Sequence, residues 1–74
     1  MKRVGQVTID NRPSVIRVTA PASPANAVRY AGCGGTLRSR VPRPERTGGQ
    51  EVWDLPQGPE SVALLHELFG FDGL

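Results

Sequence analysis

Residues 4–20 read VGQVTIDNRPSVIRVTA. Two runs rich in β-branched residues, 4–9 and 15–20, flank residues 10–14, where Asp, Asn, Pro and Ser favour a turn. Because so short a polar segment joins the two runs, the pattern predicts an antiparallel hairpin. This hairpin is the start of a sheet to which the rest of the chain must add.

The second run of this hairpin predicts which side of the sheet is buried. Ile16, Val18 and Ala20 fall on one face, because successive side chains of a strand point to opposite sides. Arg17 falls on the other face, and we expect it to point away from the core. The sheet should therefore have one apolar face, which another element covers, and one face that carries charge.

A second hairpin is predicted from residues 27–41. The segments 27–31 and 36–41 flank residues 32–35, Gly-Cys-Gly-Gly, where glycine supplies the positive φ that a tight turn needs. The preceding residues 21–26 contain two prolines, which disfavour helix, so they predict an extended connection. The inward side chains would be those of Val28, Tyr30, Leu37 and Val41. The outer face would be shared by Arg29, Arg38 and Arg40.

The last third of the chain predicts one short strand and one helix. Residues 51–55 are a strand candidate that contains the lone tryptophan, Trp53. Residues 59–69 predict a helix, because Gly58 and a following proline are typical of a helix start and Gly70 is typical of a helix end. Its apolar stripe, which should be buried, comprises Val62, Leu65, Leu68 and Phe69.

These elements predict an α+β fold: a small antiparallel sheet of three to five short strands, formed by two hairpins, with one C-terminal helix. Length predicts a single small domain over residues 1–74, since a chain this short buries only about 60% of the surface that its unfolded form exposes. Residues 42–50 have no apolar residue other than proline, so we expect a flexible loop there.

Charge is sorted along the chain. Nine basic and two acidic residues give a net charge of +7 for residues 1–46, and five acidic residues give −5 for residues 47–74. Patches of one sign steer association and exclude wrong partners. We therefore predict that the basic residues form a binding surface. They are Lys2, Arg3, Arg12, Arg17, Arg29, Arg38, Arg40, Arg43 and Arg46.

The partner of such a surface is either an acidic protein surface or nucleic acid. Eight of the nine basic residues are arginine, which favours planar, bidentate contacts to carboxylate or phosphate. Single-stranded nucleic-acid binders place aromatic residues among the basic ones, and only Tyr30 does so here. We therefore rank a protein partner first and a small nucleic-acid-binding domain as the alternative. A third interpretation is a solvated face with salt bridges to the acidic C-terminal third.

Candidate catalytic groups are few. Cys33 and His66 are the single thiol and the single imidazole, and neither has an evident orienting partner or enough companions for a zinc site. We expect a non-enzymatic protein that needs no metal or cofactor. Five acidic residues are expected to be solvated surface or a weak binding patch for a basic partner: Glu51, Asp54, Glu60, Glu67 and Asp72. No apolar run predicts a signal peptide or a membrane span, which favours the cytoplasm.

In its size, its two-signed charge, its hairpin-and-helix plan and its lack of catalytic residues, the chain resembles the small bacteriophage-encoded proteins that bind and inhibit a host enzyme. Some of these act on bacterial RNA polymerase. The resemblance spans the whole chain and carries over no individual positions. It implies a cytoplasmic regulator in a bacterial host, which occupies a surface of a larger protein complex, such as RNA polymerase, and so regulates transcription.

Overall fold

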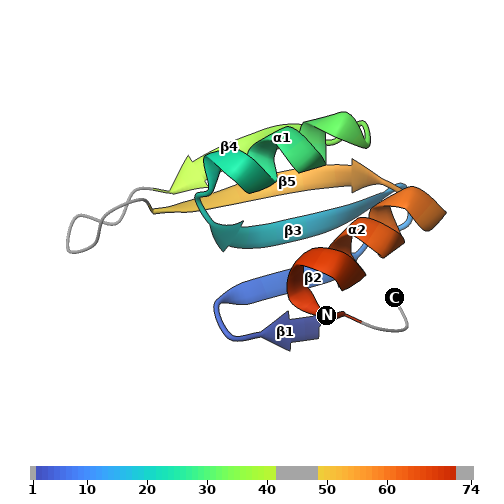
Figure 1. Cartoon of the computed structure of the whole chain (residues 1–74), viewed down its shortest axis with the longest axis horizontal. Coiled ribbons are helices and arrows are strands. Elements are labelled where there is room, and N and C mark those ends of the chain that lie inside the picture. The colour runs from blue at the N-terminus through green and yellow to red at the C-terminus, as the bar shows by residue number, and fades with distance from the viewer. Residues whose placement is uncertain (1, 42–48, 72–74) are drawn as a thin grey trace.

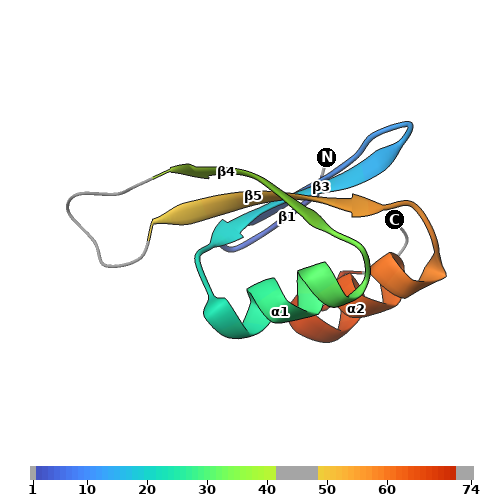
Figure 2. The same cartoon turned by 90° about the horizontal axis from the view of Figure 1, so that it is seen from above.

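The computed structural model describes residues 2–41 and 49–71, apart from the side chain of residue 41. Its elements are β1 (Lys2–Val4), β2 (Val7–Asn11), β3 (Val15–Pro21), α1 (Pro24–Gly32), β4 (Thr36–Val41), β5 (Gln50–Pro56) and α2 (Pro59–Phe69). The strands form one antiparallel sheet in the order β1-β2-β3-β5-β4, and both helices lie on the same face of it (Figures 1 and 2). The predicted α+β class is confirmed.

The predicted N-terminal hairpin is present, with one strand more than expected. β2 and β3 pair with Ile9 opposite Val18, and both side chains are buried together with Ile16. The run 4–9 was expected to be one strand, but the chain turns at Gly5, where φ is +58°, and its first residues return as β1. Glycine adopts this left-handed conformation without steric cost. Arg17 lies on the face away from the core, as predicted.

The predicted second hairpin is wrong, because residues 24–32 form α1. Ser23 caps the helix: its backbone is extended, and its Oγ accepts a hydrogen bond from the Asn26 N–H at 3.2 Å. Pro24 occupies the first turn of the helix. Backbone N–H groups in the first turn have no acceptor within the helix, so a proline there costs no helical hydrogen bond. The two prolines were expected to disfavour a helix and to give an extended connection, and the second of them begins a helix instead. The described part of the chain therefore has two helices rather than one.

The helix also changes which side chains are buried. Tyr30 packs in the core beside Trp53, with ring centroids 5.2 Å apart. Val28 was expected to face inward, but it is 72% exposed. Residues two apart share a face of a strand, whereas on a helix they point to nearly opposite sides. Leu37 is only partly covered.

β5 is the central strand of the C-terminal half. It pairs with β3 along seven residues and with β4 on its other side. Its alternate residues Glu51, Trp53 and Leu55 are buried on the face that the helices cover. The predicted short strand is thus present and two residues longer, and its position between β3 and β4 explains why Trp53 and Leu55 are buried.

α2 has the predicted bounds. It ends at Gly70, where φ is +72° and the N–H donates to the carbonyl oxygen of His66 at 2.8 Å. Leu65 of the predicted apolar stripe is fully buried. The other members of the stripe are partly buried and pack against the core: Val62, Leu68 and Phe69. Phe71, beyond the helix end, belongs to the same core.

Some expectations fall outside the described residues. Residues 42–48 make up most of the loop predicted at 42–50, and they include two of the predicted binding residues, Arg43 and Arg46. Within that predicted loop, residue 50 is described and opens β5.

Gly35, which leads into β4, should tolerate no side chain. A Cβ atom there would lie 2.5 Å from Leu55 Cδ2 and 2.7 Å from the carbonyl oxygen of Tyr30. Gly35→Ala should therefore lower the free energy of unfolding by about 1–3 kcal/mol, because the packed core must shift. Urea unfolding followed by the fluorescence of Trp53 measures this. Gly32→Ala is the matched control, since a Cβ atom there meets nothing within 4 Å. Equal stability of the two variants would contradict the prediction.

Candidate interaction surface

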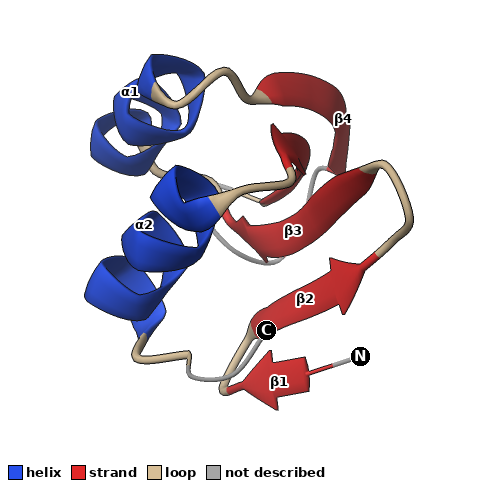
Figure 3. Cartoon of the chain, turned by 90° about the vertical axis from the view of Figure 1, so that its right-hand side faces the viewer, coloured by secondary structure: helices blue, strands red, loops and turns tan. Residues whose placement is uncertain are grey.

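The sheet face opposite the helices is the candidate interaction surface, and we call it the open face. No helix in the described part of the chain covers it (Figures 2 and 3). Arg17 and Asp54 stand directly opposite each other at its centre, in the β3–β5 ladder, and Asp10 of β2 faces Arg17 from the other side. The strand register adds Arg3, Thr8, Val15, Thr19, Thr36 and Val52.

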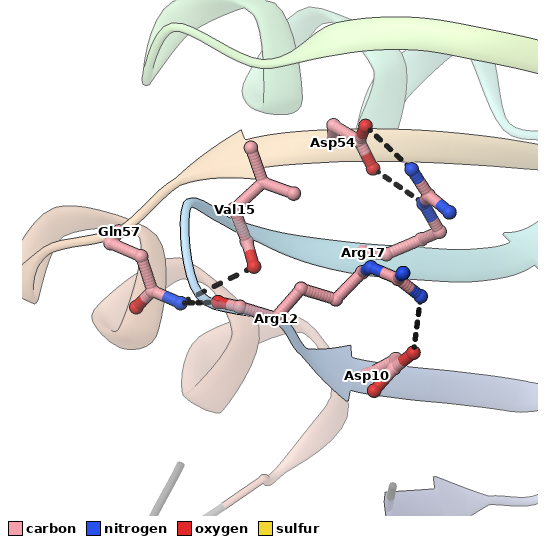
Figure 4. A network of polar contacts seen from close by, with 6 residues as sticks. All are labelled: Asp10, Arg12, Val15, Arg17, Asp54 and Gln57. Atoms are coloured by element: carbon pink, nitrogen blue, oxygen red, sulfur yellow. Dashed lines mark hydrogen bonds and ion pairs between the residues drawn. The ribbon is translucent and has the colours of Figure 1, made fainter.

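Ion pairs organise the centre of the open face. Arg17 donates from Nε to Asp54 Oδ1 at 2.8 Å and from Nη2 to Oδ2 at 3.1 Å (Figure 4). Nε of Arg38 lies 3.4 Å from the same Oδ2, so one carboxylate serves two arginines. Arg12 Nη1 pairs with Asp10 Oδ2 at 3.2 Å. The hydrogen bond from Arg17 holds the pKa of Asp54 below its usual value, and the same bond raises the pKa of Arg17.

Gln57 fixes the turn at one end of this face. Its Nε2 donates to the carbonyl oxygen of Arg12, 2.6 Å away, and lies 3.2 Å from that of Val15 (Figure 4). The β2–β3 turn is thereby tied to the segment between β5 and α2. The same Nε2 also donates to Asn11 Oδ1. No pattern in the sequence indicates these contacts, because the residues are more than 40 positions apart.

A β-bulge in β4 separates two arginines that were expected to act together. Arg38 and Arg40 are two residues apart and would share a face of a regular strand. The register between β4 and β5 shifts around Arg38, which makes it an extra residue in the ladder. Arg38 consequently approaches Asp54 on the open face, whereas Arg40 pairs with Glu51 on the helix-facing side.

The predicted common outer face of Arg29, Arg38 and Arg40 is therefore wrong. Arg29 lies on α1 and pairs with Glu67 of α2, in the helical layer. The open face gathers Arg3, Arg12, Arg17 and Arg38 from the predicted binding residues. Lys2 stands opposite Ile9 in the ladder, which places it on the helix-facing side of β1.

The charges that are sorted along the sequence are paired in space. Within the described residues 2–41 and 49–71, four ion pairs join the basic part of the chain to its acidic part: Arg17–Asp54, Arg38–Asp54, Arg29–Glu67 and Arg40–Glu51. The salt-bridge interpretation thus holds for these arginines. Asp54 and Glu51 were expected to be solvated, but their side chains are only 12% and 8% exposed. Those of Arg38 and Arg40 are 59% and 66% exposed, so the carboxylates lie beneath and the cations face solvent.

Glu51 has a second partner in the core. Its Oε1 accepts a hydrogen bond from Trp53 Nε1 at 3.2 Å, and its Oε2 accepts two from Arg40, at 3.0 and 2.7 Å. The sequence could have predicted that Glu51 is buried beside Trp53, because alternate residues of a strand share a face and Glu51 alternates with Trp53 and Leu55. The carboxylate satisfies the one polar atom of the indole, which would otherwise be buried without an acceptor.

The remaining candidate groups lie away from this surface. Cys33 Sγ is 3.3 Å from the carbonyl oxygen of Tyr30, and His66 Nδ1 is 3.1 Å from that of Phe71. Among the residues that the structure describes, no group of three or more His, Cys, Asp or Glu side chains is placed to hold a metal ion. No helix in those residues is long and apolar enough to cross a membrane. The chemistry that the open face offers is ion pairing and hydrogen bonding.

The Arg17–Asp54 pair predicts a specific loss of stability in acid. Because the pKa of Asp54 is lowered in the folded state, its ionised form stabilises the fold above the unfolded-state pKa of about 3.9, and this contribution is lost as the pH falls through the folded-state value. The difference in unfolding free energy between wild type and Asp54→Asn should therefore be constant near neutral pH and shrink below about pH 4. Urea unfolding across this range measures it.

The same pair can be tested without unfolding. In Arg17→Gln the carboxyl group of Asp54 should titrate at a higher pH than in wild type, as followed by carbon NMR of the side chain. An unchanged titration, or a stability difference that persists undiminished to about pH 2, would show that Arg17 does not set the pKa of Asp54.

Glu51 should matter for stability through Trp53 more than through Arg40. Glu51→Ala leaves the Trp53 N–H buried without its acceptor and should lower the free energy of unfolding by about 1–3 kcal/mol. Glu51→Gln keeps an acceptor and loses only an ion pair with a largely exposed arginine, so it should cost less than about 1 kcal/mol. Urea unfolding followed by tryptophan fluorescence compares the two. Equal losses would assign the effect to the ion pair instead.

Comparisons with protein-family models, with curated proteins and with solved structures found no match to this chain. The assignment of a function therefore depends on the geometry of the open face and of the strands that border it. That geometry combines a helix-free sheet surface, exposed guanidinium groups and carboxylates that hold them in place.

Proposed function

We propose that this chain is a non-enzymatic protein-interaction module that docks its open face on an acidic surface of a larger bacterial protein and thereby inhibits or modulates it. The observation that carries the proposal is the pair of exposed arginines on the sheet face that no described helix covers. The side chains of Arg12 and Arg38 are 48% and 59% exposed, and each is held by a carboxylate.

These ion pairs position the arginines without using all their donors. A guanidinium group has five N–H donors in a rigid planar arrangement. The recorded contact of Arg12 is made by Nη1 and that of Arg38 by Nε. Donors therefore remain for the carboxylates of a partner, and a side chain that is already held loses less conformational entropy when it binds.

The composition of the open face favours protein over nucleic acid. Tyr30, Trp53 and Phe71 are buried and belong to the core under the helices. Among the described residues the open face carries no aromatic ring on which a base would stack. Asp10 and Asp54 also stand among its arginines, and they would repel phosphate. A face of mixed sign suits another protein, whose charges can complement both.

The nature of the target follows from the resemblance to phage inhibitors of host enzymes. An arginine-bearing module suits an acidic surface of such an enzyme, because the surface that holds its nucleic acid is itself basic and would repel arginine. We therefore propose a bacterial nucleic-acid machine, with RNA polymerase as the first candidate, and regulation of transcription as the consequence.

A capture experiment with matched variants tests this function. The tagged chain is incubated with bacterial lysate, with and without nuclease, and with purified bacterial RNA polymerase. Arg12→Ala combined with Arg38→Ala should weaken binding at least about tenfold, since charge-assisted hydrogen bonds to a partner are lost. Arg29→Ala is the control, because it removes an exposed, paired arginine from the helical layer, and it should bind like wild type.

Each result decides between interpretations. A defined complex that survives nuclease and depends on Arg12 and Arg38, but not on Arg29, supports the module. Recovery of nucleic acid alone, lost on nuclease treatment and at moderate salt, would replace it with the nucleic-acid-binding alternative. Binding that ignores the double variant would show that the open face is not the docking surface.

A further inference from the structure

Strand β4 forms an exposed edge of the sheet. In the order β1-β2-β3-β5-β4, the two outer strands pair on one side only, and β4 has six residues whereas β1 has three. Every residue from 36 to 40 is exposed. Outside the ladder itself, no backbone hydrogen bond recorded among the described residues involves β4. Its outer side therefore offers main-chain donors and acceptors to an added strand.

Arginines flank this edge on both sides. The bulge places Arg38 on the open face and Arg40 on the helix-facing side. Their carboxylate partners, Asp54 and Glu51, lie on β5, one strand further in, and are nearly buried. A strand that added to β4 would send alternate side chains to the two faces and would pass between the two guanidinium groups.

The same charges disfavour a second copy of this chain as the added strand. Antiparallel pairing of β4 with β4 of another copy would bring two Arg38 and two Arg40 side chains into one short ladder. Like charges opposite each other destabilise a sheet, and natural sheets use bulges and charges to prevent such pairing. Pairing of β4 with β4 of a second copy is thus disfavoured, whereas the positive charge of this edge complements an acidic segment.

We propose that β4 accepts an extended, acidic segment of the partner protein as an additional strand, with one carboxylate meeting Arg38 and another meeting Arg40. This inference rests on the proposed function and specifies the partner's segment and its mode of binding. Main-chain hydrogen bonds supply affinity, and the carboxylates supply specificity. Because the arginines lie on opposite faces, the segment presents acidic residues at neighbouring positions, not at alternate ones.

Designed peptides test this mode of binding. The probe is an acetylated and amidated peptide of about eight β-branched residues with two adjacent glutamates at its centre. One control peptide has the glutamates two positions apart, one replaces them by lysine, and one carries N-methyl groups on consecutive central amides, so that neither of its edges can donate. Nitrogen-labelled full-length chain is titrated with each, and binding and amide hydrogen exchange are followed by NMR.

The adjacent-glutamate peptide should slow exchange of outward-facing amides between residues 36 and 41. The three control peptides should bind at least about tenfold more weakly, since each lacks the charge contacts or the main-chain hydrogen bonds. Arg40→Ala should weaken binding of the first peptide by a similar factor, and Arg29→Ala should leave it unchanged. Equal binding of the N-methylated peptide, or no slowing of exchange in β4, would overturn the inference.

The outcome separates this inference from the function on which it rests. If the Arg12 and Arg38 double variant loses its protein partner while no peptide protects β4, the open-face module stands and strand addition is wrong. If the peptide protects β4 while Arg12→Ala alone captures the partner normally and Arg40→Ala does not, the edge is the binding site and the open face around Arg12 is not.

Discussion

The antiparallel pairing of β3 with β5 is the constraint on which the rest of this structure depends. It joins residues 15–21 to residues 50–56 and thereby closes residues 22–49 into one long loop. Its helix-facing side sets Ile16 beside Leu55 and Val18 beside Trp53, which is the centre of the core. The entropy lost in closing so long a loop must be offset by the burial of apolar surface. The alternate positions of these two strands on this side are accordingly buried and, apart from Glu51, apolar. α1 and β4 lie within the segment of chain that connects β3 to β5.

The opposite side of the same ladder explains the distribution of charge. Arg17 and Asp54 face each other because the register that buries Ile16 and Leu55 leaves them no other position. The basic and acidic halves of the sequence are therefore brought together by the fold, and the carboxylates of β5 end beneath the arginines of β3 and β4. Ion pairing thus brings together the opposite charges that are separated along the sequence. It also keeps guanidinium groups at the surface, where they can contact a partner.

Local periodicity predicts this fold where each segment has a single strong pattern. The alternation around Ile16 and Val18 and the capped apolar stripe of α2 both predict the observed elements. α1 was missed because Ser23 and Pro24 are turn formers as well as helix starters, and nothing local distinguishes the two roles. The open face was found in part: Arg17 follows from alternation, but the position of Arg40 depends on a bulge, which is set by packing across β4 and β5 and has no local signature.

That single bulge has consequences for both surfaces of the molecule. A regular β4 would align Arg38 and Arg40 on one face, and Glu51 would then face the core with only the Trp53 N–H as a partner. The inserted residue instead gives each carboxylate of β5 an arginine: the partly buried Asp54 on one face and the buried Glu51 on the other. Burial of these acids is tolerable because each is paired and hydrogen-bonded. The requirement to satisfy charges inside the sheet is therefore what places a cation on each side of its exposed edge, so that the internal electrostatics of β5 determine what β4 presents to a partner.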